Sequence, residues 1–177
     1  MLIKKYFYPD LRFCGVCDID VARLKDAGIR YAILDIDNTL VPYTSPEPDE
    51  YAMCFLDKLT QNGISFCFVS NNNQERVDLF NKKIGAKTFP KGKKPLLYGV
   101  NKALKSFGAN NKNTVLIGDQ VFTDVCAGKR AKMLTILVDP ILEVDTLFFK
   151  TKRYFEKKII KSYEKNKKKN SGKVLKC

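Results

Sequence analysis

Short apolar runs alternate with amphipathic stretches along most of the chain. Strand-like runs rich in branched and aromatic residues occupy 31–37, 65–70, 114–119 and 134–139, with a weaker one at 86–89. Uninterrupted apolar runs of this length are typical of parallel strands that are buried on both faces. Patterns of helical periodicity lie between them, at 49–61, 73–84, 95–107 and 122–131. This alternation predicts an α/β fold with a five-stranded, mostly parallel sheet and helices on both of its faces.

Glycine and proline mark the expected ends of these helices. Gly63, Gly85 and Gly108 follow the first three helical patterns, as glycine commonly does at helix C-termini. Pro95 is expected in the first turn of the third helix, where its missing N–H costs nothing. Each predicted helix therefore ends before the next strand begins.

Reactive side chains follow the predicted strands. They are Asp35 and Asp37, then Ser70 and Asn71, then Lys91, Lys93 and Lys94, and finally Asp119 with Asp124 shortly after it. Because ligands bind beyond the carboxyl ends of the strands in an open parallel sheet, we expect these groups to converge. Several carboxylates together would repel one another unless a hard cation were bound, and oxygen ligands favour Mg²⁺. The sequence therefore predicts a magnesium site at this edge of the sheet.

Composition narrows the chemistry that this site can perform. The chain has 177 residues and no histidine, which excludes Ser-His-Asp and Cys-His nucleophile pairs, histidine-ligated zinc and imidazole acid–base catalysis. Any reaction must use carboxylates, lysine, cysteine, hydroxyl groups or a bound ion. The length suits one α/β domain of ordinary size.

Six cysteines are present, and their setting argues against a disulfide framework. Cys54, Cys67 and Cys126 lie in apolar runs, where a free thiol behaves as a small hydrophobic group. Cys14 and Cys17 form a lone CxxC motif without a second pair, which favours a structural role over zinc or redox chemistry. The sequence shows no secretory signal and no membrane-spanning run, so we expect a reducing cytoplasm, with peripheral attachment at the inner face of the membrane as a further expectation.

Four short motifs give the chain a family resemblance. They are Asp35-Ile-Asp37-Asn38-Thr39-Leu40, Ser70-Asn71-Asn72, Lys94-Pro95 and Gly118-Asp119-Gln-Val-Phe-Thr-Asp124. In order and spacing they resemble the four motifs of haloacid-dehalogenase-type (HAD) phosphatases, over about residues 20–140. The variants at the second and fourth motifs resemble subclass IIIA and its YqeG-like branch, which is also similar to phosphatidylglycerophosphate phosphatases. The resemblance implies a Rossmann-like HAD fold and hydrolysis of a phosphomonoester.

The resemblance also implies a role for each residue of the first three motifs. Asp35 would be the nucleophile that forms an aspartyl-phosphate, and Asp37 the general acid and base. Ser70 and the Asn71 N–H would hold the phosphoryl oxygens, with Thr39 as a further substrate-binding residue. Lys94 would neutralise the negative charge on the transferred phosphoryl group and on Asp35. Each has an ordinary alternative: the acids as cap or turn residues, Ser70 as a helix cap, and Thr39 in a local backbone hydrogen bond.

The implied cofactor is Mg²⁺. Its ligands would be Asp35, the Asp37 carbonyl, Asp119 and Asp124, with Asp124 more suited to orienting a bound water or Lys94. Lys91 and Lys93 are expected to be solvated, because Lys94 is the lysine that precedes proline as in the family pattern.

The spacing of the motifs predicts that no cap domain covers the site. Asp37 and Ser70 are 33 residues apart, and Ser70 and Lys94 are 24 apart, which leaves room for little more than one helix and one strand each time. A site without a lid does not enclose a small metabolite. It suits a phosphate presented on a lipid headgroup, a nucleic-acid end or a protein.

The C-terminal residues have a different character from the rest. We divide the chain into a phosphatase domain at 1–142, with a lead-in at 1–28, and a basic helix followed by a disordered lysine-rich tail at 143–177. Residues 150–177 carry a net charge of +10 out of +13, which suggests an anionic partner. Aromatic and aliphatic residues recur there at helical spacing, namely Phe148, Phe155, Ile159 and Tyr163. Such a helix indicates an interfacial membrane binder, or a last helix that packs its apolar face on the domain. Both hold if the residues before about 156 are packed and those after it are free.

Three functional hypotheses follow. The first is a Mg²⁺-dependent phosphomonoesterase that acts at a membrane, with phosphatidylglycerophosphate as the substrate that the resemblance implies. The second is an enzyme of the same mechanism acting on nucleotides or nucleic-acid ends. The third is a non-catalytic, basic RNA-binding module on the HAD fold. The complete set of motifs speaks against the third, since a binding module does not need Asp37 and Lys94 together.

Overall fold

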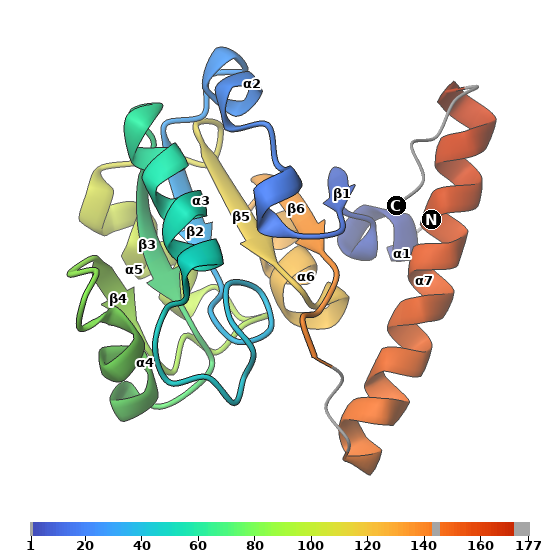
Figure 1. Ribbon diagram of the computed structural model, residues 1–177. Coiled ribbons are helices and arrows are strands. Elements are labelled where there is room, and N and C mark those ends of the chain that lie inside the picture. Colours follow the sequence, from blue (N-terminus) through green and yellow to red (C-terminus); the bar gives the residue numbers. More distant parts are fainter. Residues whose placement is uncertain (1, 143–145, 172–177) are drawn as a thin grey trace.

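The computed structural model describes residues 2–142 and 146–171 and contains one six-stranded sheet (Figure 1). The strands are β1 (Leu11–Phe13), β2 (Tyr31–Leu34), β3 (Ser65–Val69), β4 (Lys87–Phe89), β5 (Thr114–Gly118) and β6 (Leu134–Val138). Their order is β1-β6-β5-β2-β3-β4, and every pairing is parallel. The five predicted strands are confirmed. The sixth, β1, was not predicted because a three-residue run containing Arg12 has no strand pattern of its own; it is added by pairing with β6.

Four helices lie between the strands, and side chains cap the N-termini of two of them. They are α3 (Glu50–Gln61), α4 (Gln74–Asn81), α5 (Tyr98–Phe107) and α6 (Cys126–Arg130), with a π-helical turn, η2 (Val121–Val125), before α6. The Asp49 and Asn73 side chains accept hydrogen bonds from the first turns of α3 and α4. The prediction for Pro95 was wrong, because α5 begins three residues after it, at Tyr98. The lead-in holds α1 (Leu2–Phe7), η1 (Val16–Asp18) and α2 (Val21–Asp26).

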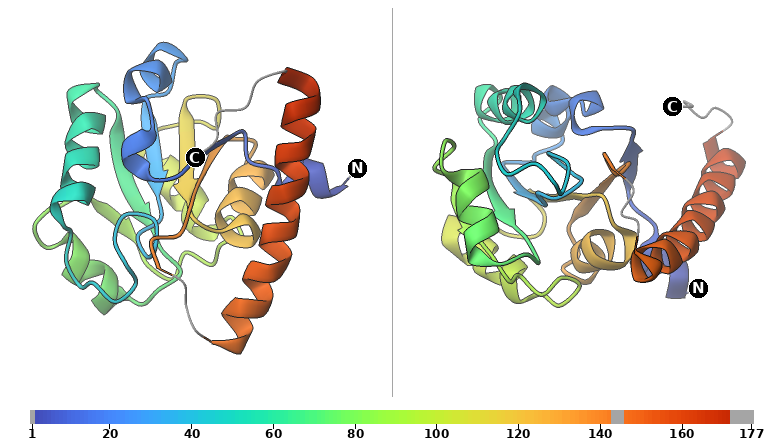
Figure 2. Two further views of the ribbon diagram at one scale, coloured as in Figure 1. Left: turned by 45° about the vertical axis from the view of Figure 1, so that its right-hand side comes forward. Right: turned by 60° about the horizontal axis from the view of Figure 1, so that its bottom comes forward.

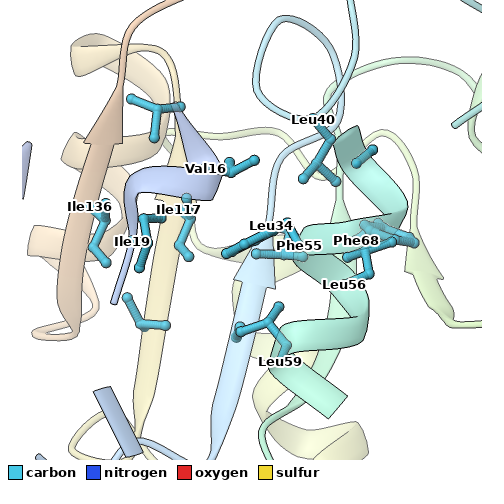
Figure 3. Packing of buried hydrophobic residues seen from close by; sticks show 14 of the residues in the cluster. Val16, Ile19, Leu34, Leu40, Phe55, Leu56, Leu59, Phe68, Ile117 and Ile136 are labelled. Carbon is cyan, nitrogen blue, oxygen red and sulfur yellow. The ribbon is translucent and has the colours of Figure 1, made fainter. Parts of the chain in front are cut away.

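Apolar side chains cover both faces of the sheet. On one face, Leu34, Phe68 and Ile117 pack against Phe55 of α3 and the lead-in residue Val16 (Figure 3). On the other face, the neighbouring positions along the strands pack against α5 and α6; these include Ile33, Cys67, Val69 and Leu116, which meet Val100, Ala103 and Ala127. Successive strand residues point to opposite faces, so the continuous apolar runs of the sequence supply both layers of the core.

The last helix, α7 (Leu147–Ser171), lies beside the edge of the sheet formed by β1 and β6, next to α1 (Figures 1 and 2). Ile159 and Ile160 pack against Val121, Val125 and Leu137. Tyr163 is buried and its ring meets the Tyr8 ring edge-on. The prediction that the last helix packs its apolar face on the domain is therefore correct for part of that face.

Two expectations for the C-terminal residues need correction. The helix does not become free at residue 156, since Glu164 pairs with Arg12 and Asn166 donates a hydrogen bond to Tyr8. The lysine-rich stretch is helical as far as Ser171, because these contacts extend the docked helix beyond its apolar pattern. The side chain of Phe148, part of the predicted aromatic face, lies outside the described residues, as do residues 143–145 and 172–177.

Segments 38–69 and 71–93 are fully described and hold no cap domain. The first contains only a loop, α3 and β3, and the second only α4 and β4. None of the helices in the described residues combines the length and apolar character needed to cross a bilayer.

The two cysteines of the CxxC motif differ in state. Cys14 is disulfide-bonded, contrary to the expectation that disulfides are absent. The Cys17 thiol is free and donates to the Tyr51 carbonyl oxygen. The two cysteines therefore do not form a disulfide with each other.

Candidate active site

The carboxyl ends of the strands meet around a cavity of about 530 Å³. Asp35 follows β2, Ser70 follows β3 and Asp119 follows β5, so three neighbouring strands each deliver a polar group to the same edge. The cavity is lined by Asp35, Asp37, Asn38, Tyr43, Ser70, Asn71, Asn72, Lys94, Gln120, Thr123 and Lys152. The structure therefore brings most of the predicted site residues together.

Three buried carboxylates cluster at this edge of the sheet, and of the three only Asp35 is among the residues that line the cavity. One oxygen from each of Asp35, Asp119 and Asp124 lies within 4.8 Å of the other two. Burial raises the pKa of Asp35 to about 8, although Lys94 opposes the shift, and the charges of Asp124 and Asp119 add to it. Burial also raises the pKa of Asp119 to about 6, against the opposing effect of Arg153. Burial thus disfavours the ionised forms of Asp35 and Asp119, and a cation bound beside them would favour those forms.

Lys94 supplies one positive charge to this cluster. Its Nζ lies 2.6 Å from Oδ1 of Asp35 and 2.7 Å from Oδ1 of Asp124. The two carboxylates outweigh burial and raise the pKa of Lys94, so the amine stays charged. The Asn71 side chain fixes the Lys94 backbone, because Nδ2 donates to the Lys94 carbonyl at 2.8 Å and Oδ1 accepts from the Lys94 N–H at 2.7 Å. Lys91 and Lys93 are exposed, as expected of solvated side chains.

Asp124 is oriented by the turn that carries it. Its Oδ2 accepts hydrogen bonds from the Gln120 N–H at 3.2 Å and the Thr123 hydroxyl at 3.1 Å. A β-carbon at Gly118 would lie 2.3 Å from the Asp124 Cγ, so only glycine leaves room for the carboxyl group there. The Asp124 carboxyl group can therefore occupy this position only because residue 118 is glycine.

A tight turn presents Asp37 to the cavity. Asn38 has φ of 62°, a left-handed conformation that asparagine tolerates, and its N–H donates to the Val41 carbonyl at 2.7 Å. The Asp37 carboxylate is bound by Arg76 of α4, with Nη2 and Nε at 2.8 and 3.1 Å from Oδ1. Asn72 donates to its other oxygen at 3.2 Å. Asp37 is thus held at the cavity wall, apart from the three clustered carboxylates.

The two hydroxyl residues of the motifs occupy different positions. Ser70 lines the cavity, and its Oγ accepts a hydrogen bond from the Asn72 N–H at 3.0 Å. It does not cap α4, since Asn73 does so. Thr39 is buried and does not line the cavity; its hydroxyl has no hydrogen-bond partner within the part of the chain that the structure describes.

Sequence reasoning missed four charged residues around the site. Arg76 binds Asp37, and three residues of α7 reach the loop after β5: Lys152, Arg153 and Glu156. None has a sequence signal, because all four lie in ordinary charged helix surfaces. Arg153 and Glu156 are an i,i+3 pair of opposite charge, which on a solvated helix would be a surface ion pair.

The clustered carboxylates of Asp35, Asp119 and Asp124 fit a divalent cation. The ligands on offer are oxygens, the donor set that hard cations such as Mg²⁺ prefer. Oδ1 of Asp119 is buried and has no hydrogen-bond partner among residues 2–142 and 146–171. A buried acceptor of this kind requires a partner, and a cation would provide one.

This combination of parallel sheet, open carboxyl edge, clustered aspartates and buried lysine defines a hydrolase of the haloacid dehalogenase type. Residues 20–132 match the haloacid dehalogenase-like hydrolase family, and the chain belongs to it. It is 32% identical over 164 residues to the Bacillus subtilis (strain 168) protein named "Probable phosphatase YqeG", covering 93% of this chain and 95% of that one. The predicted family and branch are confirmed, and the chain is a phosphatase of this family.

Solved structures agree with the fold. A Listeria monocytogenes serotype 4b protein superimposes with a TM-score of 0.54 and 16% identity, over 67% of this chain and 85% of that chain. The cobalt-bound deoxy-D-mannose-octulosonate 8-phosphate phosphatase of Haemophilus influenzae gives 0.52 and 14%, over 80% and 93%. At these identities the likeness supports the Rossmann-like α/β fold that the sequence predicts.

Proposed function

We propose that this chain is a Mg²⁺-dependent phosphomonoesterase that uses Asp35 as its nucleophile and accepts phosphates presented on a large substrate, in particular the lipid phosphatidylglycerophosphate. The observation that carries the proposal is the cluster of Asp35, Asp119 and Asp124, of which Asp35 lines an open cavity and Asp35 and Asp124 both pair with Lys94 Nζ. Asp35, the Asp37 carbonyl and Asp119 would hold the cation. Mg²⁺ bound there would neutralise the carboxylates and charge on the phosphoryl group.

The chemistry of the chain's own residues proceeds in two displacements. An oxygen of Asp35 attacks phosphorus, an aspartyl-phosphate forms, and the ester P–O bond breaks. Asp37 gives a proton to the departing ester oxygen. It then takes a proton from a water molecule, whose oxygen attacks phosphorus and breaks the bond to Asp35. Inorganic phosphate leaves, and both aspartates return to their starting state.

Three residues would bind the phosphoryl oxygens during both steps. Ser70 and Asn71 line the cavity one residue after the other at the end of β3, so the hydroxyl and the Asn71 N–H serve the same group. Lys94 would stabilise the charge on the phosphoryl oxygens while remaining beside Asp35. Asp124, which binds the Lys94 amine, would keep that amine in place.

The open site and the surface of α7 support a membrane-presented substrate. Leu147, Tyr154 and Phe155 are exposed on α7, the last by 51%, and lysines lie between and beyond them. Exposed aromatic residues beside lysines favour the boundary of an anionic bilayer. Lys152 of the same helix lines the catalytic cavity, so this surface and the cavity are adjacent. A lipid headgroup would reach Asp35 without leaving the membrane surface.

A phosphatase assay on the full chain tests the proposal. Wild-type protein should hydrolyse a soluble chromogenic phosphate with Mg²⁺, lose activity in EDTA and regain it when Mg²⁺ is restored. Asp35→Asn should abolish turnover, whereas Asp57→Asn, a matched change on the exposed side of α3, should not. Near wild-type turnover by Asp35→Asn, or activity that persists in chelator, would contradict the mechanism.

The substrate class needs its own comparison. Phosphatidylglycerophosphate in anionic vesicles should be hydrolysed with a higher kcat/KM than a 5′-phosphorylated oligonucleotide or a nucleotide. The double variant Tyr154→Ser with Phe155→Ser should lower the rate on vesicles and leave the rate on the soluble chromogenic phosphate unchanged. Preference for the oligonucleotide would instead favour a nucleic-acid-end phosphatase.

A further inference from the structure

We infer that Arg153 and Glu156 of α7 are positioning residues that set the Asp119 carboxylate for cation binding, an inference that rests on the proposed function. Arg153 binds Asp119 twice. Its Nη2 pairs with Oδ2 of the carboxylate, and its Nη1 donates to the Asp119 carbonyl oxygen at 2.8 Å. Both the backbone and the side chain of Asp119 are thereby tied to a helix 34 residues further along the chain.

Glu156 completes this arrangement. It is a charged residue with only 1% of its surface exposed, and it has two partners. Its Oε2 lies 3.0 Å from Nη1 of Arg153, and its Oε1 accepts a hydrogen bond from the Phe122 N–H at 3.1 Å. A carboxylate this deeply buried is stable only when it is paired and hydrogen-bonded. Glu156 therefore fixes the position of the Arg153 side chain relative to the start of η2.

The contacts leave one particular oxygen of Asp119 for a cation. Oδ2 is occupied by Arg153, whereas Oδ1 is buried without a hydrogen-bond partner in the described part of the chain. A ligand held by a second group loses little freedom when a cation binds, so its affinity for the cation is higher. Arg153 thus selects the rotamer in which Oδ1 serves as ligand.

The charges of Arg153 and Glu156 decide whether the two residues strengthen or weaken cation binding at Asp119. An isolated guanidinium beside Asp119 would repel an incoming divalent cation. Here the Glu156 carboxylate lies against the same guanidinium and offsets its charge. What remains is the orientation of Asp119, which strengthens cation binding. Removing Arg153 and Glu156 together keeps the net charge and deletes only the orientation.

The decisive measurement is the Mg²⁺ dissociation constant of the full chain, obtained by calorimetry and by the Mg²⁺ dependence of Tm, without substrate. The double variant Arg153→Gln with Glu156→Gln should raise the Mg²⁺ Kd by about 10- to 100-fold, as loss of the group that orients a metal ligand typically does. At saturating Mg²⁺ its KM for a soluble phosphate should stay near that of the wild type. An unchanged Kd would make the pair a structural tie only, and a lower Kd would make Arg153 a competitor of the cation; either result overturns the inference.

The matched control breaks another charged contact of the same helix. Arg12→Gln with Glu164→Gln removes the ion pair between β1 and α7, together with the contact of Arg12 with Asp139, and leaves the contacts of Arg153 with Asp119 in place. It should lower Tm and leave the Mg²⁺ Kd unchanged. If the first double variant does not fold, Arg153→Lys keeps the charge but loses the paired donors, and its Kd should still rise; an unchanged Kd for a folded Arg153→Lys would overturn the inference. Failure of wild-type protein to bind Mg²⁺ would instead refute the proposed function itself.

Discussion

Two nitrogens of Arg76 bind a single oxygen of Asp37, with Nη2 at 2.8 Å and Nε at 3.1 Å from Oδ1. Arg76 lies on α4, which follows the second motif, and its Nη1 also donates to the Pro46 carbonyl at 3.0 Å in the loop after the first motif. The general acid and base of the proposed mechanism is therefore held in place by a helix that follows the second motif. This restraint leads to the first prediction.

Arg76→Gln should lower kcat by about 10- to 100-fold, because a proton donor displaced by about 1 Å loses much of its effect. The Mg²⁺ Kd should change much less than kcat, since Arg76 holds the Asp37 side chain, whereas the cation would bind the Asp37 backbone carbonyl. Steady-state kinetics at saturating Mg²⁺ provide the measurement, with Arg23→Gln on the exposed side of α2 as the matched control. An unchanged kcat for Arg76→Gln would remove this residue from the mechanism.

The second prediction concerns stability and pH in the presence of chelator. The pKa of Asp35 is raised from 3.8 to about 8, first by burial, so the folded protein binds a proton there more tightly than the unfolded chain does. Stability from this group is present below about pH 4 and is lost as the pH rises toward 8. Asp35→Asn does not titrate, so its Tm in EDTA should exceed that of the wild type by an amount that grows from pH 5 to pH 8.

Differential scanning calorimetry of both proteins across this pH range measures that difference. Asp57→Asn, a change of the same chemistry at an exposed position, should show no such growth. A wild-type protein that is more stable than Asp35→Asn at pH 8 in EDTA would mean that Lys94 outweighs burial, contrary to the raised pKa of Asp35.

The third prediction follows from the contact between Gly118 and Asp124. Gly118→Ala introduces a β-carbon 2.3 Å from the Asp124 Cγ, so the carboxyl group or the strand end must move. Overpacking of this kind destabilises by about 1–3 kcal/mol. Chemical denaturation should show that loss, and the displaced Asp124 should reduce activity as well. Wild-type stability with full activity would show that the turn accommodates a side chain.

The fourth prediction concerns the end of α7. Removing residues 164–177 deletes six lysines and Glu164, a net change of −5. Tm should fall, because the ion pair with Arg12 and the contact of Asn166 with Tyr8 are lost. Activity on a soluble phosphate should survive, since the catalytic groups lie between Asp35 and Asp124. Binding to anionic vesicles should weaken and depend less steeply on salt.

Cosedimentation with anionic and neutral vesicles at several salt concentrations measures this binding. Neutral vesicles should show a much smaller change on truncation. Equal binding of the truncated and full-length chains to anionic vesicles at low salt would leave the exposed aromatic residues of α7 as the remaining membrane contact.

The amino-acid sequence by itself determined the α/β class, the five strands other than β1, and the meeting of Asp35, Ser70, Lys94 and Asp119. The reason is local. An apolar run of strand length marks a buried parallel strand, and a polar residue at its end is placed at the carboxyl edge whatever the rest of the chain does. The absence of a cap domain could be predicted in the same way, from the number of residues between motifs.

The tertiary structure alone decided what surrounds these groups. The contact between Arg76 and Asp37 joins residues 39 positions apart, and that between Arg153 and Asp119 joins residues 34 apart. Each involves an arginine in a helix with many charged residues, so no local pattern separates it from its solvated neighbours. The same holds for β1, which is a strand because β6 offers it an edge. Contacts of this kind depend on how docked elements meet in space, and the periodicity of a single segment carries no information about them.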